Sequence, residues 1–235
     1  PPPFFFHPED GIRDPLWSRG LGDCIRDRHR TQELIEYQNL SYAEGYMSFI
    51  GTIFEKEQKT RSSSELSQNV AKYLFKLMAT KDEYEVARLS LKTELDSAIS
   101  QEFGKSAKIS YMLHPPFLKA MENIPILNML PGVKSKLALG SWFKVFYVML
   151  KNMKFLRGTP FDFMAWFSND VRKADKKALD HYKSILTKNI DEIGNGKYQD
   201  LKDFSVLPDI IRGYEEVRLE TMDEYYSKSN NLFKS

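Results

Sequence analysis

Residues 66–89, "LSQNVAKYLFKLMATKDEYEVARL", contain two helical patterns separated by a charged turn. Apolar side chains recur at three- and four-residue steps through the first half of this stretch, at Leu66, Val70, Tyr73, Leu74, Leu77 and Met78. That spacing places them on one face of an α-helix. The second half predicts another helix that begins at acidic residues, because carboxylates near a helix N-terminus interact favourably with its dipole. The stretch therefore predicts two consecutive helices.

Similar periodicity extends over most of the chain and predicts a mainly α protein of about seven helices. The other predicted helices span residues 32–55, 94–103, 142–156, 171–186, 198–204 and 216–227. One segment differs, because Ile109, Tyr111 and Leu113 alternate with polar or small residues and a His-Pro-Pro sequence follows them. Since a residue before proline is disfavoured in the α region, a short extended or strand-like segment is expected near residues 108–118.

The first 28 residues lack the periodicity of an ordered segment. "EDGIRD" (9–14) and "SRGLGD" (18–23) resemble translations of two sequencing-adapter segments, in the right order and with a nine-base gap that suits an index. "CIRDR" (24–28) matches the tail of the second adapter if one base was dropped. We therefore expect residues 1–28 to be an adapter-derived, disordered artefact. The alternative is a natural disordered leader.

The charge of the chain is nearly balanced, with 34 basic and 32 acidic residues and a formal net charge of +2. Charge therefore does not predict nucleic-acid or membrane-surface binding. No apolar run reaches the roughly 18 residues of a membrane span. The single cysteine, Cys24, lies in the adapter-like stretch, so no disulfide, thiolate nucleophile or cluster ligand is expected beyond it. The sequence predicts a soluble cytoplasmic protein.

Motifs for the common catalytic and cofactor sites are absent from the sequence. It contains no Gly-rich phosphate loop, no G-x-S-x-G and no H-E-x-x-H. The histidines beyond the adapter-like stretch, His29, His114 and His181, lie far apart and have no carboxylate at a metal-ligand spacing. We therefore expect no catalytic residue, no bound cofactor and no metal site in this chain.

Several charged residues at turns and helix ends are candidates for an interface or a structural motif. They are Lys81, Asp82, Glu83, Arg88, His114, Arg157, Asp162 and Arg212. The local explanation is that Asp82 and Glu83 cap a helix, that Glu85 pairs with Arg88, and that Arg157 pairs with Asp162 across the turn at Gly158. The functional explanation is an electrostatic contact surface for another domain. Both remain open, and His114 is additionally the only candidate base for a small independent hydrolase or transferase.

Five stretches, in this order, resemble one family: "YQNLSYAEGY", "AKYLFKLMATKDEYEVARL", "YMLHPPFL", "LRGTPFD" and "LPDIIRGYEEVR". They are similar to the C-terminal region of the fused indolepyruvate ferredoxin oxidoreductases, members of the 2-oxoacid:ferredoxin oxidoreductases. The resemblance covers residues 32–228, and "KDEYEVARL" and "RGTPFD" are its most specific parts. It implies that residues 29–235 are a helical C-terminal domain, with sub-halves 29–120 and 138–235.

The resemblance also implies a reaction for the parent enzyme. An aryl 2-oxoacid such as indolepyruvate is oxidatively decarboxylated, with coenzyme A as acyl acceptor and ferredoxin as electron acceptor. Thiamine diphosphate with Mg²⁺ stabilises the carbanion, and iron–sulfur clusters carry the electrons. The motifs that hold these groups are absent here, so the expected role is a non-catalytic structural or interface domain. Its expected partners are the catalytic domains of the same oligomeric enzyme. The alternative is a free-standing helical protein-interaction module.

Overall fold

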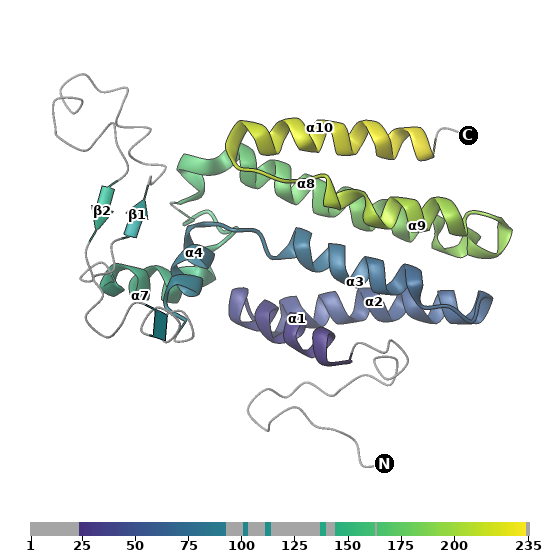
Figure 1. The fold of residues 1–235 in the computed structure, drawn as a ribbon, viewed down its shortest axis with the longest axis horizontal. Coiled ribbons are helices and arrows are strands. Elements are labelled where there is room, and N and C mark those ends of the chain that lie inside the picture. Colours follow the sequence, from purple (N-terminus) through teal and green to yellow (C-terminus); the bar gives the residue numbers. More distant parts are fainter. Residues whose placement is uncertain are drawn as a thin grey trace, which may run out of the picture. The chain divides into compact units, whose positions relative to one another are not determined.

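The structure is a computed structural model that describes residues 24–92, 101–102, 111–113, 137–139, 144–162 and 164–233. The described part is mainly helical, which confirms the predicted fold class (Figure 1). The chain divides into two compact units. Unit 1 combines residues 1–79 with residues 173–235, and unit 2 comprises residues 80–172.

Unit 1 is a bundle in which the first helices of the chain pack with the last ones. Its elements are α1 (Cys24–Tyr37), α2 (Leu40–Thr60), α3 (Glu65–Met78), most of α8 (Ala165–Asn189), the 3-10 helix η5 (Ile190–Asn195), α9 (Tyr198–Val206), the 3-10 helix η6 (Leu207–Asp209) and α10 (Glu215–Leu232). Helix α3 packs against α2 on one side and against α9 on another. The bundle therefore joins segments that are more than a hundred residues apart in sequence.

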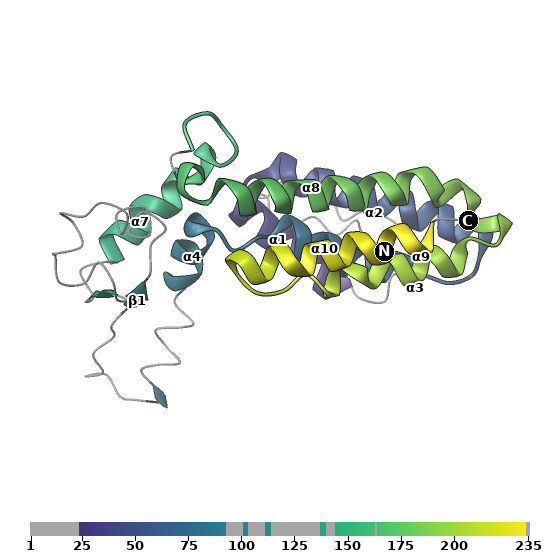
Figure 2. The ribbon, with the colours of Figure 1, turned by 90° about the horizontal axis from the view of Figure 1, so that it is seen from above.

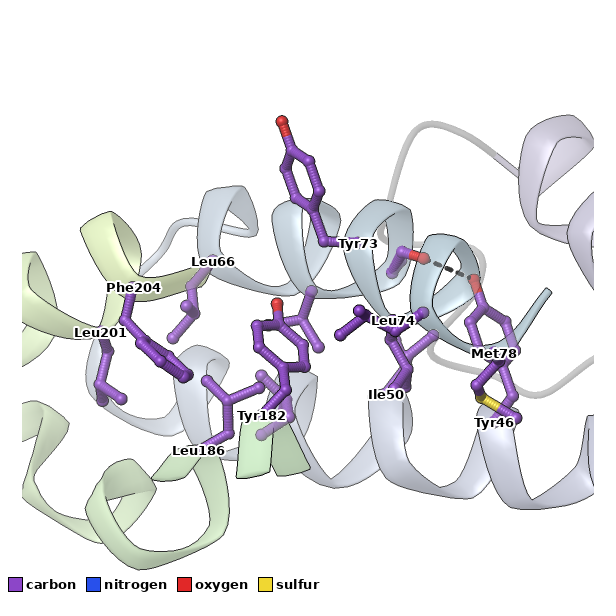
Figure 3. Packing of buried hydrophobic residues seen from close by; sticks show 14 of the residues in the cluster. Tyr46, Ile50, Leu66, Tyr73, Leu74, Met78, Tyr182, Leu186, Leu201 and Phe204 are labelled. Carbon is purple, nitrogen blue, oxygen red and sulfur yellow. Dashed lines mark hydrogen bonds between the residues drawn. The ribbon is translucent and has the colours of Figure 1, made fainter. Parts of the chain in front are cut away.

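The core of unit 1 forms where the apolar stripe of α3 meets α2, α8 and α9. Figure 3 shows Leu66 of α3 near Leu201 and Phe204 of α9, with Tyr182 and Leu186 of α8 in the same core. The buried tyrosines find backbone partners: Tyr46 donates to the Ala71 carbonyl at 3.0 Å, and Tyr182 donates to the Ser205 carbonyl at 2.8 Å. These bonds satisfy the hydroxyl groups that burial removes from water.

The predicted helix over residues 32–55 is wrong in its continuity, because the structure has two helices there. Helix α1 ends at Tyr37, and α2 begins at Leu40 after the N-cap residue Asn39. The Asn39 side chain accepts a hydrogen bond from the Tyr42 amide at 2.9 Å. An asparagine at this position satisfies an amide that the new helix would otherwise leave unpaired, so it starts a helix rather than continuing one.

Unit 2 is smaller and is built around a pair of helices. Its described elements are α4 (Glu83–Ser90), the strands β1 (Tyr111–Leu113) and β2 (Leu137–Leu139), α7 (Lys144–Asn152), the 3-10 helix η4 (Met153–Leu156) and the first residues of α8. Helices α4 and α7 lie side by side (Figure 2). A small apolar core joins them, formed by Tyr84, Ala87, Tyr147, Leu150 and Met164.

The strand-like segment predicted near residues 108–118 is confirmed in part. Residues 111–113 form β1, which pairs with β2 in an antiparallel ladder that places Met112 opposite Ala138. The rest of that segment lies outside the described residues. The helix predicted over residues 94–103 also lies outside them, except for the helical residues Gln101 and Glu102.

Two predicted boundaries differ from the structure. Helix α1 begins at Cys24, so the last five residues of the stretch expected to be disordered are helical, while residues 1–23 lie outside the described part. The expected sub-halves 29–120 and 138–235 differ from the compact units, because unit 1 takes residues from both ends of the chain. Packing of α3 on α9 unites those ends, and one sequence has no local signal for such long-range pairing.

Candidate functional site

Charged side chains from two segments of unit 2 gather around the ring of Tyr84. We call this group the Tyr84 cluster: Asp82, Glu83, Tyr84, Arg157, Asp162 and Arg172. Asp82 is the N-cap of α4, where its carboxylate accepts a hydrogen bond from the Glu85 amide at 2.9 Å. The same carboxylate accepts from Arg157, whose Nη2 lies 2.8 Å from Asp82 Oδ1. One aspartate thus caps the helix and binds the turn that follows η4.

Asp162 is 1% exposed, and all four acceptor positions of its carboxylate are used. Oδ1 accepts from the Tyr84 hydroxyl at 2.9 Å and from the Ala165 amide at 3.2 Å. Oδ2 accepts from the Gly158 amide at 3.0 Å and from Arg172 Nη1 at 2.7 Å. Gly158 has φ +75°, which turns the chain so that its amide can reach this oxygen. The carboxylate therefore has no acceptor position left for a ligand.

Two guanidinium groups lie near the Tyr84 ring. The Cζ atom of Arg157 is 5.5 Å from the ring centroid, and that of Arg172 is 5.7 Å from it. Arg172 also pairs with Glu83, so it binds α4 and the start of α8 together. Three carboxylates face two guanidiniums, and the positive N-terminal end of α4 lies beside the third negative charge. The charges in the cluster therefore compensate one another.

The electrostatics fix the protonation states of the cluster. Burial raises the pKa of Tyr84, and the hydrogen bond to Asp162 and the negative charge of that carboxylate raise it further. Tyr84 therefore remains a hydroxyl donor at neutral pH. Burial by itself would lower the pKa of Arg172, but the carboxylates of Glu83, Asp82 and Asp162 outweigh it, and the pKa is raised overall. A protonated tyrosine and a permanently charged arginine act as a clamp, not as a general acid or base.

The structure brings three of the predicted residues together with Asp82: Glu83, Arg157 and Asp162. The local explanation for Asp82 as a helix cap is confirmed. The Glu85–Arg88 pair is also confirmed, with Arg88 Nη2 2.7 Å from Glu85 Oε1, and both side chains are buried. Lys81 is exposed.

Among the described candidate residues, Lys81, Arg88 and Arg212 are not part of the cluster, and one predicted pair is wrong. His114 lies outside the described residues. Arg212 belongs to unit 1, where its exposed guanidinium pairs with Asp209. The expected pairing of Arg157 with Asp162 across the Gly158 turn does not form, because Arg157 binds Asp82 and Asp162 binds Arg172.

Sequence reasoning did not identify Arg172 as a member of the cluster. It stands in a Lys- and Asp-rich helix with no local mark that separates it from its exposed neighbours. Two of its partners, Glu83 and Asp162, are 89 and 10 residues away in sequence. Only the packing of α8 near α4 within unit 2 reveals its role.

A second buried carboxylate, Glu57 in unit 1, was also not identified. It is 0% exposed and accepts hydrogen bonds from the amides of Leu66 and Ser67 at 3.0 and 2.9 Å, and from the Tyr198 hydroxyl at 2.8 Å. These contacts cap α3 and bind it to α9. A signal exists in the sequence, because Glu57 continues the apolar spacing of Ile50 and Ile53.

His181 lies on the inner side of α8, against α10. Its Nε2 is 3.0 Å from the Oγ of buried Ser229, and its ring contacts the edges or faces of Phe204, Tyr225 and Tyr226. Burial lowers the pKa of His181, and Lys177 and Lys188 lower it further. The site joins α10 to the bundle through a neutral histidine.

The described residues contain no group of three or more His, Cys, Asp or Glu side chains that could hold a metal ion. Among the helices of that same part of the chain, none is both long enough and apolar enough to cross a membrane. The polar chemistry described above consists of helix caps, ion pairs and hydrogen bonds inside each unit.

Comparison with known proteins identifies the family. Residues 26–230 match the "Family of unknown function (DUF6537)". The chain belongs to the DUF6537 family. The match covers all of unit 2, including the Tyr84 cluster, and residues 26–79 and 173–230 of unit 1. No curated protein and no solved structure matches the chain.

Proposed function

We propose that this DUF6537 chain is a non-catalytic structural and interface domain of a 2-oxoacid:ferredoxin oxidoreductase of the indolepyruvate type. In such an enzyme the oxidative decarboxylation, with coenzyme A and ferredoxin as acceptors, takes place on other modules. Those modules would hold the thiamine diphosphate, the Mg²⁺ and the iron–sulfur clusters. The domain would then work in the cytoplasm as part of an oligomeric enzyme.

One observation carries the proposal. The two stretches that most resemble the enzyme family, "KDEYEVARL" and "RGTPFD", meet in the Tyr84 cluster although they are about 75 residues apart, as the Arg157–Asp82 contact illustrates. Their charges are used in caps and internal ion pairs, with no acceptor left on Asp162 for a substrate. The charged residues of both motifs therefore bind one another inside unit 2, as expected for a domain with a structural role.

The buried charged residues of unit 2 are not suited to form the surface that contacts another domain. Asp162 and Arg88 are buried, so reversing their charges would disturb the fold of unit 2 whatever the domain binds. Such variants cannot separate an interface role from a structural one. Exposed side chains are the ones that can contact another domain, and Lys81 and Arg212 remain candidates on that ground.

Long-read sequencing of the source DNA across the His29 codon tests the proposal. An open frame that runs upstream into thiamine-binding and oxidoreductase modules is the expected result, and it would also identify residues 1–28 as adapter-derived. A start codon with a ribosome-binding signal just before Gln32 would contradict the proposal and favour the free-standing interaction module. Adapter-like codons that are present in the genome would contradict the artefact interpretation of the leader.

A further inference from the structure

The sequence contains a single Asn-Gly dipeptide, Asn195-Gly196, at the turn between η5 and α9 of unit 1. Because glycine has no side chain, its amide nitrogen approaches the preceding asparagine carboxamide with the least steric hindrance. Asparagine is among the residues that heat and time modify most easily. An Asn-Gly pair is therefore the sequence in which the backbone most readily attacks its own side chain, provided that the fold leaves it free to do so.

The fold places this dipeptide at an exposed helix end. Asn195 is the last residue of η5, and Gly196 follows it as the C-cap residue with φ +96°. Gly194, Asn195 and Gly196 are all exposed, so water and hydroxide reach the carboxamide. The hydrogen bonds of a 3-10 helix have poorer geometry than those of an α-helix, and helix ends fray. Asn195 can therefore rotate toward the Gly196 nitrogen without disturbing the core.

A nearby asparagine, Asn189, is held in place and shows the contrast. Its Nδ2 donates to the Ile185 carbonyl at 2.8 Å, and its Oδ1 accepts from the Lys197 amine at 3.5 Å. The next residue is Ile190, whose branched side chain hinders any approach of its own amide nitrogen. Within the part of the chain that the structure describes, the Asn195 side chain has no hydrogen-bond partner. The two asparagines therefore differ both in restraint and in the residue that follows.

We propose that Asn195 is a site of spontaneous deamidation and isoaspartate formation in the folded chain. Hydroxide removes the Gly196 amide proton, and the nitrogen attacks Asn195 Cγ, so that an N–Cγ bond forms and the Cγ–Nδ2 bond breaks. The departing nitrogen takes up a proton from water and leaves as ammonia. Water then opens the succinimide ring, giving aspartate if the new N–Cγ bond is cleaved and isoaspartate if the original peptide bond is cleaved. Nothing is oxidised or reduced, and water is the only co-reactant.

The two products should affect the start of α9 differently. Isoaspartate routes the backbone through the side-chain methylene and so lengthens the chain just before α9. The residues that follow are held by specific contacts: Lys197 pairs with Glu192 at 2.6 Å, and the Tyr198 hydroxyl donates to buried Glu57 at 2.8 Å. Isoaspartate should therefore loosen the start of α9. Aspartate keeps the normal backbone, and its negative charge before the helix N-terminus is compatible with the helix dipole.

The test incubates the folded full chain at neutral and at mildly alkaline pH and follows the tryptic peptide 189–197 by mass spectrometry. This peptide contains both asparagines, so Asn189 is an internal control, and electron-transfer fragmentation distinguishes aspartate from isoaspartate. Asn195 is expected to react faster than Asn189 by about tenfold or more, which corresponds to about 1.4 kcal/mol in activation free energy. The reaction should accelerate with pH, because hydroxide removes the Gly196 proton. Equal conversion of the two asparagines would overturn the proposal.

A variant and a reference peptide separate the effect of the fold from that of the sequence. Gly196→Ala adds a side chain at the attacking nitrogen, in a space that is open among the described residues, and should slow the reaction by about tenfold. Gly194→Ala, which leaves the dipeptide intact, is the control and should keep the original rate. The folded chain should react within about tenfold of a synthetic peptide of residues 189–197. A slower folded chain would show that the turn protects Asn195, and an unchanged rate in Gly196→Ala would exclude the succinimide route; either result would overturn the proposal.

Hydrogen exchange tests the inferred effect on α9. Residues 198–206 should exchange faster in aged chain that carries isoaspartate than in fresh chain, whereas Asn195→Asp should leave their exchange unchanged. Equal exchange in the aged and fresh chains would overturn the effect on α9.

Discussion

The Tyr84 hydroxyl donates a hydrogen bond to Asp162 at 2.9 Å across 78 residues of sequence. Around this bond, Arg157 and Arg172 approach the tyrosine ring and bind the carboxylates of α4 and of the turn before α8. The bond joins the stretches "KDEYEVARL" (81–89) and "RGTPFD" (157–162). Single substitutions can measure how much each residue of the Tyr84 cluster contributes to the free energy of unfolding.

Replacing Asp162 by alanine should destabilise unit 2 by about 3–5 kcal/mol, because it leaves Arg172 and two backbone amides without their buried partner. Denaturant unfolding followed by hydrogen exchange of residues 83–90 would measure this. Asp170→Ala, at an exposed position of α8, is the control and should change stability by less than about 0.5 kcal/mol. Equal effects of the two changes would contradict the clamp.

Removing only the hydroxyl group of Tyr84 should have a smaller effect. Tyr84→Phe keeps the ring between the guanidiniums but leaves one acceptor position of Asp162 empty, for a loss of about 1–2 kcal/mol. Tyr214→Phe is the control, since Tyr214 is an exposed tyrosine. A Tyr84→Phe protein as stable as the wild type would show that the bond contributes nothing.

Glu57→Ala should destabilise unit 1 by about 3 kcal/mol, because the Leu66 and Ser67 amides and the Tyr198 hydroxyl would all lose a buried acceptor. The matched change is Glu55→Ala, two residues earlier on the exposed face of α2. Thermal unfolding of the two variants provides the comparison. A loss confined to Glu55→Ala would refute the capping role of Glu57.

The Gly213 turn should not accept a side chain. Gly213 has φ +83°, and a Cβ atom there would lie 2.7 Å from Val217 Cγ1. Gly158 has a similar φ of +75°, but the space around it is open. Gly158→Ala should therefore cost only the backbone strain of about 1–2 kcal/mol, and Gly213→Ala should cost more. Denaturant midpoints would rank them, and the reverse order would contradict the turn geometry.

Lowering the pH should weaken the packing of α10 on the bundle, because His181 becomes protonated. The pKa of His181 is lowered by burial from the ordinary value of 6.5, so the unfolded chain binds the proton first as the pH falls. Stability should be constant above that value and decrease below it, until His181 is protonated in the folded state too. His181→Gln should flatten this part of the stability profile. Parallel profiles of His181→Gln and wild type would exclude the mechanism.

Sequence periodicity predicted most of the fold because the helices are amphipathic. The stripe from Leu66 to Met78 gave α3, and the acidic start of "DEYEVARL" gave α4. The break at Asn39 was missed because a single capping residue interrupts an apolar pattern that otherwise continues on both sides. A repeated apolar spacing therefore predicts a helix well, whereas a helix boundary that depends on a single capping residue is easily missed.

The contacts of the Tyr84 cluster were less predictable. The Glu85–Arg88 pair follows from spacing on one helix, but the partner of Asp162 was assigned to Arg157 on proximity in sequence. The observed partner is Arg172, because the first turns of α8 lie near α4 within unit 2. Long-range pairing of this kind is determined by packing, and no short motif encodes it.

The most direct test of the proposed function is the activity of the complete oxidoreductase with and without residues 26–230. Indolepyruvate-dependent reduction of ferredoxin would be measured together with sedimentation of the oligomer. The shortened enzyme is expected to retain its thiamine diphosphate and clusters but to lose assembly and turnover, and the separately produced chain is expected to restore both. Full turnover and an unchanged oligomer without the domain would contradict the proposed function.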